Sequence, residues 1–298
     1  MPEEIKPVEK PAPAKKAGLK LDFTTVAGLV VAFGGIVGGL LGEGGKIKDI
    51  LQLTAAMIVL GGTTGAVLVS VPLAALRGGL RRLASVFLDS APQFGEVVNE
   101  IIGYATKARK NGLVSLEDEA MKIADPFLRK ALNLAVDGTD LQELRKMLEL
   151  EIDIEEQRAE AEAKVFETAG GYAPTVGIIG AVLGLIQVMK NLANIEEVGH
   201  GIAVAFVATV YGVGLANLLL LPAASKIKAR AQAETLRREL IEEGVSGIVE
   251  GLNPKLIRIK IECYGKEPEA KPKKPKEVKA TPETVEQKGP EAPAGARV

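Results

Sequence analysis

Four long stretches of this sequence contain no Asp, Glu, Lys or Arg, and they constrain the fold more than any other feature. A helix needs about 20 apolar residues to cross the hydrocarbon core of a bilayer. One such helix is often buried in a soluble protein, but four in a chain of 298 residues predict an integral membrane protein of the all-α class. The four stretches are residues 23–42, 50–76, 168–189 and 201–225.

The distribution of basic residues predicts the orientation of the chain. Lys and Arg cluster before the first stretch and after the second and fourth, and they are sparse in the two short loops between paired stretches. Because cytoplasmic loops are enriched in Lys and Arg, we expect both termini and the long middle segment to lie in the cytoplasm. The clustered residues are Lys15, Lys16, Lys20, Arg77, Arg81, Arg82, Lys226, Lys228 and Arg230.

Composition divides the chain into six segments. Its two ends are rich in Lys, Pro and Glu and cannot bury a core, so we expect them to be disordered. The predicted segments are a cytoplasmic leader (1–21), a transmembrane hairpin (22–76), a cytoplasmic helical loop (77–167), a second transmembrane hairpin (168–225), cytoplasmic C-terminal helices (226–264) and a tail (265–298).

The middle segment has helical periodicity. We expect Ser115 to be one helix N-cap, and Thr139 with Gln142 to form the capping box of another. No proline follows until Pro174, so the second helix is predicted to continue from the cytoplasm into the third stretch. Its apolar stripe consists of Leu141, Leu144, Leu148 and Ile152.

Composition also excludes several function classes. A net charge of −1 offers no general attraction to nucleic acid. With one cysteine and one histidine, Cys- and His-based metal clusters and a Ser-His-Asp triad are not expected. We find no phosphate-binding glycine loop, so the sequence predicts neither an enzyme nor a bound cofactor.

Glycine spacing and the absence of charge predict what the four spans do. Small residues four positions apart let helices approach closely, which favours oligomers and moving bundles, although ordinary packing within the chain is an alternative. Ion-transporting helices usually carry their own Asp, Glu or His; none of the spans does, so a titrating carboxylate would have to come from another chain. The packing glycines are Gly34, Gly38, Gly42, Gly61, Gly62, Gly65, Gly180 and Gly184.

Two prolines are placed near the predicted cytoplasmic ends of the third and fourth spans. Pro174 and Pro222 each remove one backbone hydrogen bond and loosen their helix. Each alone is explained by a tolerated kink or a helix terminus. Their paired placement on one antiparallel hairpin makes a conformational hinge an equal alternative.

These motifs together resemble the flagellar stator A subunits of the MotA/PomA family, within the wider MotA/TolQ/ExbB superfamily. The resemblance covers residues 22–264 and rests on five segments that occur in the family's order. They are "GGLLGEGGKIKDILQLTAAMIVLGGTTGAVLVSVPL", "KARKNGLVSLED", "YAPTVGIIGAVLGLIQVMKNL", "VGHGIAVAFVATVYGVGLANLLLLPAASKIK" and "IVEGLNPKLIRIKIE".

The resemblance implies a two-component motor in the bacterial inner membrane. Family members form homo-oligomers, pentamers by resemblance, around the single spans of a MotB/PomB-type B subunit. That subunit supplies a membrane Asp and a peptidoglycan-binding domain. Ion flow then drives the rotor protein FliG through the cytoplasmic loop of the A subunit.

Several residues match functional positions of the family. Arg109 and Glu117 match charged loop residues that face FliG, and Glu151 matches a further charged position; the alternative is a solvated surface, where ion pairs contribute about 0–1 kcal/mol. The two prolines match positions linked to conformational change. Thr209 matches a pore-side threonine, whose alternative is a bond to its own helix carbonyl.

The conducted ion is a finer prediction. Sodium-type members tend to have a hydroxyl group where this chain has Ala181. Sodium needs oxygen ligands in place of its waters, whereas a proton needs a carboxylate and a water path. The sequence therefore favours protons over sodium, although Thr175, Thr209 and Tyr211 still offer hydroxyl groups along the pathway.

Two other functions fit part of the sequence. An ExbB/TolQ-type envelope energiser shares the chemistry of the last hairpin, but such proteins typically have a single span in place of the "GGTTGA" hairpin. A membrane scaffold without ion conduction would explain the glycines and the lack of charge. It would not explain the threonines, prolines and loop motif together.

Overall fold

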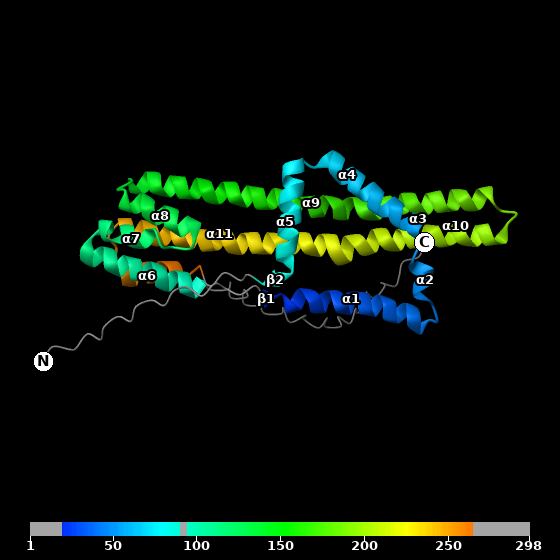
Figure 1. The fold of residues 1–298 in the computed structure, drawn as a ribbon, viewed down its shortest axis with the longest axis horizontal. Helices are drawn as coiled ribbons and strands as arrows, with labels where there is room; N and C mark the ends of the chain where they lie inside the picture. The colour runs from blue at the N-terminus through cyan, green and yellow to red at the C-terminus, as the bar shows by residue number, and fades with distance from the viewer. Residues whose placement is uncertain (1–19, 90–93, 265–298) are drawn as a thin grey trace, which may run out of the picture. The chain divides into compact units, whose positions relative to one another are not determined.

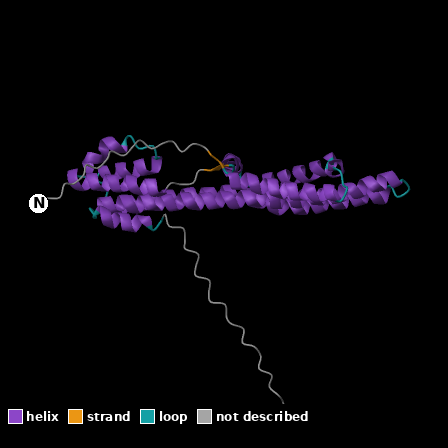
Figure 2. Cartoon of the chain, turned by 90° about the horizontal axis from the view of Figure 1, so that it is seen from below, coloured by secondary structure: helices purple, strands orange, loops and turns teal. Residues whose placement is uncertain are grey.

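The computed structural model describes residues 20–89 and 94–264, and almost all of this part is helical, as the sequence predicts (Figures 1 and 2). The only strands in these residues are β1 (Lys20–Leu21) and β2 (Leu88–Asp89), two residues each, which pair antiparallel. Disorder was predicted for 1–21 and 265–298, and residues 1–19 and 265–298 lie outside the described residues. The remaining two, Lys20 and Leu21, form β1. Within the described ranges, four helices are long and apolar enough to cross a membrane.

The first two of these helices form the first hairpin. Helix α1 (Phe23–Gly42) is capped by Asp22, and none of its side chains is buried by the described part of the chain. The connecting loop contains α2 (Ile47–Ile50). The second helix is continuous through α3 (Leu53–Ala56), a π-helical turn η1 (Met57–Gly61) and α4 (Gly62–Ser70).

The second span is shorter than predicted. The prediction extended it over 50–76, but α4 ends at Ser70 and a separate helix, α5 (Leu73–Val86), follows. Pro72 explains the break: it disfavours helical geometry in the preceding residue, and Val71 is accordingly extended. The chain therefore turns before α5, which runs across the long helices in Figure 1.

The third predicted span belongs to one helix of 50 residues, α9 (Leu141–Lys190). This confirms the predicted continuity from the loop into the apolar stretch. Asp140, rather than Thr139, caps the helix, because the Asp140 carboxylate accepts a hydrogen bond from the Gln142 N–H at 3.0 Å. The predicted stripe is confirmed, with Leu144, Leu148 and Ile152 buried.

The fourth span is equally continuous. Helix α10 (Ile195–Gly214), a π-helical segment η3 (Leu215–Leu220) and α11 (Leu221–Val249) form a single run of 55 residues. Helix α11 lies beside the first part of α9, and α10 lies beside the rest of it (Figure 1). Both helical runs of the second hairpin thus continue beyond their apolar stretches, as the first part of α9 and as α11, into the helical domain.

The helical domain closes around the far ends of α9 and α11. It contains α6 (Phe94–Asn111), the 3-10 turn η2 (Leu113–Leu116), α7 (Glu117–Ala120), α8 (Pro126–Val136) and α12 (Pro254–Glu262). Their apolar faces form one core with α9 and α11. Ser115 is not the predicted N-cap: it lies inside η2, and its hydroxyl donates to the Gly112 carbonyl.

Helix α5 crosses α9 at close range. A Cβ atom on Gly78 would overlap the Glu162 carboxyl group, and one on Gly79 would lie 3.0 Å from the Glu162 carbonyl oxygen. Arg82, on the same face of α5, forms ion pairs with Glu162 and, at 3.0 Å, with Glu155. Two glycines and one arginine therefore hold α5 against α9.

Candidate functional site

The hairpin of α9 and α10 is held together by contact between backbones. A Cβ atom on Gly212 would lie 2.5 Å from the Ala173 carbonyl oxygen, and one on Gly177 would lie 2.9 Å from the Ala208 carbonyl oxygen. At Gly184 the corresponding distance, to the carbonyl oxygen of Gly201, is 2.7 Å. No larger residue fits at these positions unless the helices separate.

The sequence identified only part of this contact. Gly180 and Gly184 were predicted and lie at the interface, with Gly180 facing Ala208. Gly177 and Gly212 were missed. Gly177 lies three residues before Gly180 and seven before Gly184, so helical spacing places all three on one face.

The remaining predicted packing glycines divide into two groups. Gly62 packs against Val176 of α9, where a Cβ atom would lie 2.6 Å from Cγ1 of the valine. The others have no described neighbour within 4 Å of a Cβ position, so their contact with another helix remains a prediction. They are Gly34, Gly38, Gly42, Gly61 and Gly65.

Two predicted pathway threonines make hydrogen bonds within their own helices. The exposed Thr175 hydroxyl donates to the Tyr172 carbonyl at 2.8 Å, and the half-buried Thr209 hydroxyl donates to the Ala205 carbonyl at 3.2 Å. Thr209 lies beside Gly177, whose Cβ position is 3.5 Å from the Thr209 Cα atom. Each hydroxyl oxygen can still accept a hydrogen bond from water or from another chain.

Tyr211 and Ala181 have different surroundings. The Tyr211 hydroxyl donates to the Ile50 carbonyl at 2.5 Å and accepts a hydrogen bond from the Gln52 N–H at 3.3 Å. It therefore ties α10 to the start of the second span. Ala181 is half-buried on α9, one residue after Gly180, and adds no polar group.

The two predicted conformational prolines act at one level of the hairpin. Pro174 lies inside α9, where it removes the bond that its N–H would make to the Gly170 carbonyl. Pro222 lies in the first turn of α11, directly after the π-helical segment η3. Gly170 packs against Leu221, so the two irregular turns are in contact.

The predicted charged loop residues lie at the far end of the helical domain. Arg109 lies in the last turn of α6 and Glu117 begins α7; both are exposed, and neither has an ion pair with a described residue. Gly112 makes the turn between them with φ of +83°, a value that favours glycine. A Lys107–Glu119 ion pair at 2.8 Å closes the turn.

Glu151 is in a different environment from the other two charged residues. It lies on α9, and its carboxylate forms an ion pair with Lys130 of α8. Contact of Glu151 with a partner would compete with this pair. Arg109 and Glu117 face no such competition within the described residues.

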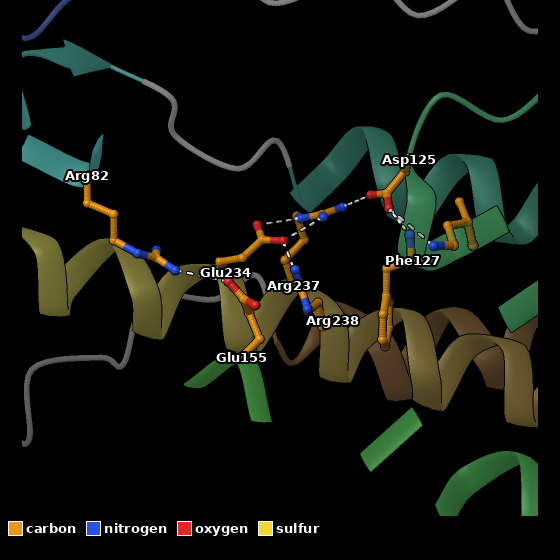
Figure 3. A network of polar contacts seen from close by, with 8 residues as sticks. Arg82, Asp125, Phe127, Glu155, Glu234, Arg237 and Arg238 are labelled. Atoms are coloured by element: carbon orange, nitrogen blue, oxygen red, sulfur yellow. Dashed lines mark hydrogen bonds and ion pairs between the residues drawn. The ribbon is translucent and has the colours of Figure 1, made fainter. Parts of the chain in front are cut away.

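A polar network between the hairpin and the far end of the domain contains ion pairs of α5 with α9 and of α8 with α11 (Figure 3). Arg237 of α11 forms ion pairs with Asp125 and, at 2.7 Å, with Glu234. Asp125 also caps α8. Burial raises the pKa of Asp125, but the Arg237 guanidinium and the N–H groups of Leu128 and Phe127 together lower it by more, so the pKa is below its usual value.

The same network includes a cation–π contact. The Arg238 guanidinium carbon lies 5.3 Å from the centre of the Phe127 ring, and this side chain also forms an ion pair with Glu234 at 3.2 Å. Charged contacts therefore reinforce the apolar core where α8 meets α11. No group of three His, Cys, Asp or Glu residues in 20–89 and 94–264 is placed to hold a metal ion.

Comparisons with known proteins match both hairpins. Residues 119–240 match the MotA/TolQ/ExbB proton channel family, and residues 26–111 match the family described as Motility protein A N-terminal. The chain is 34% identical over 262 residues to the uncharacterized protein YtxD of Bacillus subtilis, covering 87% of this chain and 96% of that one.

A named relative and a solved structure are similar over the same range. Motility protein A of Bacillus subtilis is 33% identical over 245 residues, covering 82% of this chain and 91% of the relative. A chain in the structure of C. jejuni MotAB matches with a TM-score of 0.80 at 30% identity, covering 84% of this chain and 98% of that one. The resemblance found in the sequence motifs thus extends to the fold.

Proposed function

This chain belongs to the motility protein A group of the MotA/TolQ/ExbB proton channel family, and from this membership we propose that it is the ion-conducting A subunit of a flagellar stator. The observation that carries the proposal is the match over both hairpins, 26–111 and 119–240. An ExbB/TolQ-type energiser is the alternative. The first hairpin, matched to the motility protein A N-terminal family, favours the stator.

We propose that a B subunit supplies the group that carries the ion. The four apolar stretches of this chain contain no Asp, Glu, Lys or Arg, and the solved relatives are described as MotAB complexes. The partner would contribute one membrane Asp and a domain that holds peptidoglycan. Several copies of this chain, a pentamer by family resemblance, would surround the partner's spans in the bacterial inner membrane.

Within that assembly, we assign separate tasks to the parts of the chain. The α9–α10 hairpin faces the partner, with Thr175, Ala181 and Thr209 along the ion pathway. Protonation of the partner's Asp changes the charge beside the hairpin and shifts its packing at the two proline turns. Helices α9 and α11 carry the displacement to Arg109 and Glu117, which face FliG.

We propose protons as the conducted ion, with sodium less favoured. Ala181 adds no oxygen ligand, and the Tyr211 hydroxyl is engaged by Ile50 and Gln52. Sodium would have to replace its waters with such oxygens. The driving force for either ion is about 2.3 kcal/mol per charge per 100 mV.

The test is the swimming speed of a strain whose only stator contains this chain and its B subunit. The proposal expects motility to be abolished by a protonophore and to be unaffected by removing sodium. If swimming speed instead follows the sodium concentration at constant pH, the stator function stands and the conducted ion is sodium. Normal swimming after deletion of this gene from a strain with no other stator genes would refute the stator function and favour the envelope energiser.

A further inference from the structure

Helix α5 does not follow the direction of the two long helices that it contacts, α9 and α11 (Figure 1). It begins three residues after the end of α4 and runs across the long helices (Figure 1). Since α9 crosses the membrane and α11 continues in the same direction from the fourth span, a helix lying across them lies along the membrane plane. Its position on α9 then decides which layer of the membrane it occupies.

The contacts with α9 give that position. Gly78 and Gly79 of α5 meet Glu162 and Phe166 of α9. The apolar stretch of α9 begins at residue 168. At about 1.5 Å per residue, these contacts lie about 3 to 9 Å outside the hydrocarbon core. The headgroup layer is about 5–8 Å thick on each side of a bilayer, so the contacts of α5 extend from within this layer to its outer edge.

The two faces of α5 differ in a way that suits this layer. Gly78, Gly79 and Arg82 face α9. The opposite face combines apolar and basic residues: Leu73 and Leu80 are 55% and 57% exposed, and Arg77 and Arg81 are exposed beside them. Exposed leucine and arginine side chains next to each other are typical of a helix that lies in a membrane interface.

Arg77 and Arg81 are also unengaged within the described residues. Three other cations at this level have carboxylate partners: Lys226 and Arg230 pair with Asp22, and Lys228 pairs with Glu167 at 2.7 Å. Neither Arg77 nor Arg81 has an ion pair with a described residue. Arginine binds phosphate groups through paired N–H donors.

We infer that α5 is a binding surface for anionic phospholipids of the cytoplasmic leaflet. Arg77 and Arg81 bind the phosphate groups, and Leu73 and Leu80 enter the acyl boundary. The lipid would fix the turn between the second span and the helical domain against α9. This inference rests on the membrane orientation in the proposed function, but it does not require ion conduction or a rotor.

The test measures lipid binding by the full chain in a non-ionic detergent. Phosphatidylglycerol or phosphatidylcholine is titrated in, and the thermal midpoint is followed by circular dichroism at a helical wavelength. Each arginine near an anionic surface should contribute about 5-fold in affinity, so Arg77→Gln/Arg81→Gln should weaken phosphatidylglycerol binding about 30-fold. Phosphatidylcholine binding should not change.

Two further variants control for charge and folding. Lys122→Gln/Arg129→Gln removes two exposed cations from the helical domain and should keep the wild-type preference. Arg77→Lys/Arg81→Lys keeps the charge and should retain most of the preference for phosphatidylglycerol. Wild-type protein that does not distinguish the two lipids would overturn the inference, whatever the variants do.

Other occupants give different results. If glycerol 3-phosphate alone shifted the thermal midpoint as much as phosphatidylglycerol does, the surface would bind a soluble anion, and the inference of a lipid would be wrong. A changed oligomeric mass of the glutamine variant, with lipid preference intact, would assign the surface to a second copy of this chain. Because melting is measured without ion flow, neither result bears on whether the chain is a stator.

Discussion

Gly170 of α9 lies against Leu221 at the start of α11, where a Cβ atom on the glycine would come within 2.7 Å of the leucine Cδ2 atom. Gly170 carries the carbonyl that Pro174 leaves without its helical donor, and Leu221 precedes Pro222. The two proline turns are therefore in direct contact, although 48 residues separate them in sequence. Movement at one of them changes the packing of the other.

The first prediction concerns these prolines. Pro174→Ala restores a backbone donor and straightens the turn, so swimming speed should fall while the B subunit still copurifies. Pro254→Ala, at the start of α12, is the control, because an N–H at that position has no helical acceptor to bond. A Pro174→Ala complex that dissociates on purification would contradict a hinge.

The second prediction concerns the glycine contact between α9 and α10. Gly212→Ala places a methyl group against the Ala173 carbonyl, and overpacking of this kind costs about 1–3 kcal/mol. The thermal midpoint should fall by several degrees. Gly214→Ala makes the same change two residues further along, where no described atom lies within 4 Å. Equal melting of the two variants would show that the helices separate freely.

The third prediction concerns the attachment of α5 to α9. Arg82→Gln leaves the buried Glu162 carboxylate with Arg158, 3.3 Å away, as its remaining cation. Losing one partner of a buried pair costs up to about 3–5 kcal/mol; with Arg158 still present, we expect a loss of about 2 kcal/mol in unfolding free energy.

A double-mutant cycle tests this assignment. Adding Glu162→Gln to Arg82→Gln should recover part of the lost stability, because no unpaired charge remains. Arg81→Gln, on the exposed face, should be neutral in non-ionic detergent. Strict additivity of the Arg82 and Glu162 changes would show that the pair does not stabilise the crossing.

The fourth prediction concerns pH. Burial, followed by repulsion from Glu149, raises the pKa of Glu242 in the helical domain to about 7. The folded protein thus binds this proton more tightly than the unfolded chain, so its contribution to stability is present at acidic pH and is lost as pH rises through 7. Glu242→Gln should raise the thermal midpoint at pH 8 and leave it nearly unchanged at pH 5. A constant difference across this range would be inconsistent with the assigned titration.

The fifth prediction concerns the exposed charges at the α6–α7 turn. Arg109→Glu and Glu117→Lys should each abolish or strongly reduce swimming while membrane insertion and B-subunit binding remain normal. Lys146→Glu reverses an exposed charge on α9, outside this turn, and should have little effect. Loss of membrane insertion in either the Arg109 or the Glu117 variant would contradict the assignment of these residues to rotor contact.

The sequence by itself determined the features that depend on local pattern. The four spans follow from apolar length, and the continuity of α9 follows from the absence of proline before Pro174. The buried stripe at Leu144, Leu148 and Ile152 follows from helical spacing. Such signals are contained in a short stretch of chain, and no partner element is needed to interpret them.

Tertiary structure decided the features that depend on which surfaces meet. Spacing places Gly177 on the face of Gly180 and Gly184 but does not show what that face meets, and Gly212 could not be separated from other glycines, because the role of both comes from a facing carbonyl. Leu73–Leu76 had the apolar character of the second span, yet they belong to α5, whose direction is set by Gly78 and Arg82 against Glu162. A side chain's neighbours across space come from the packed helices, and periodicity along one helix does not specify them.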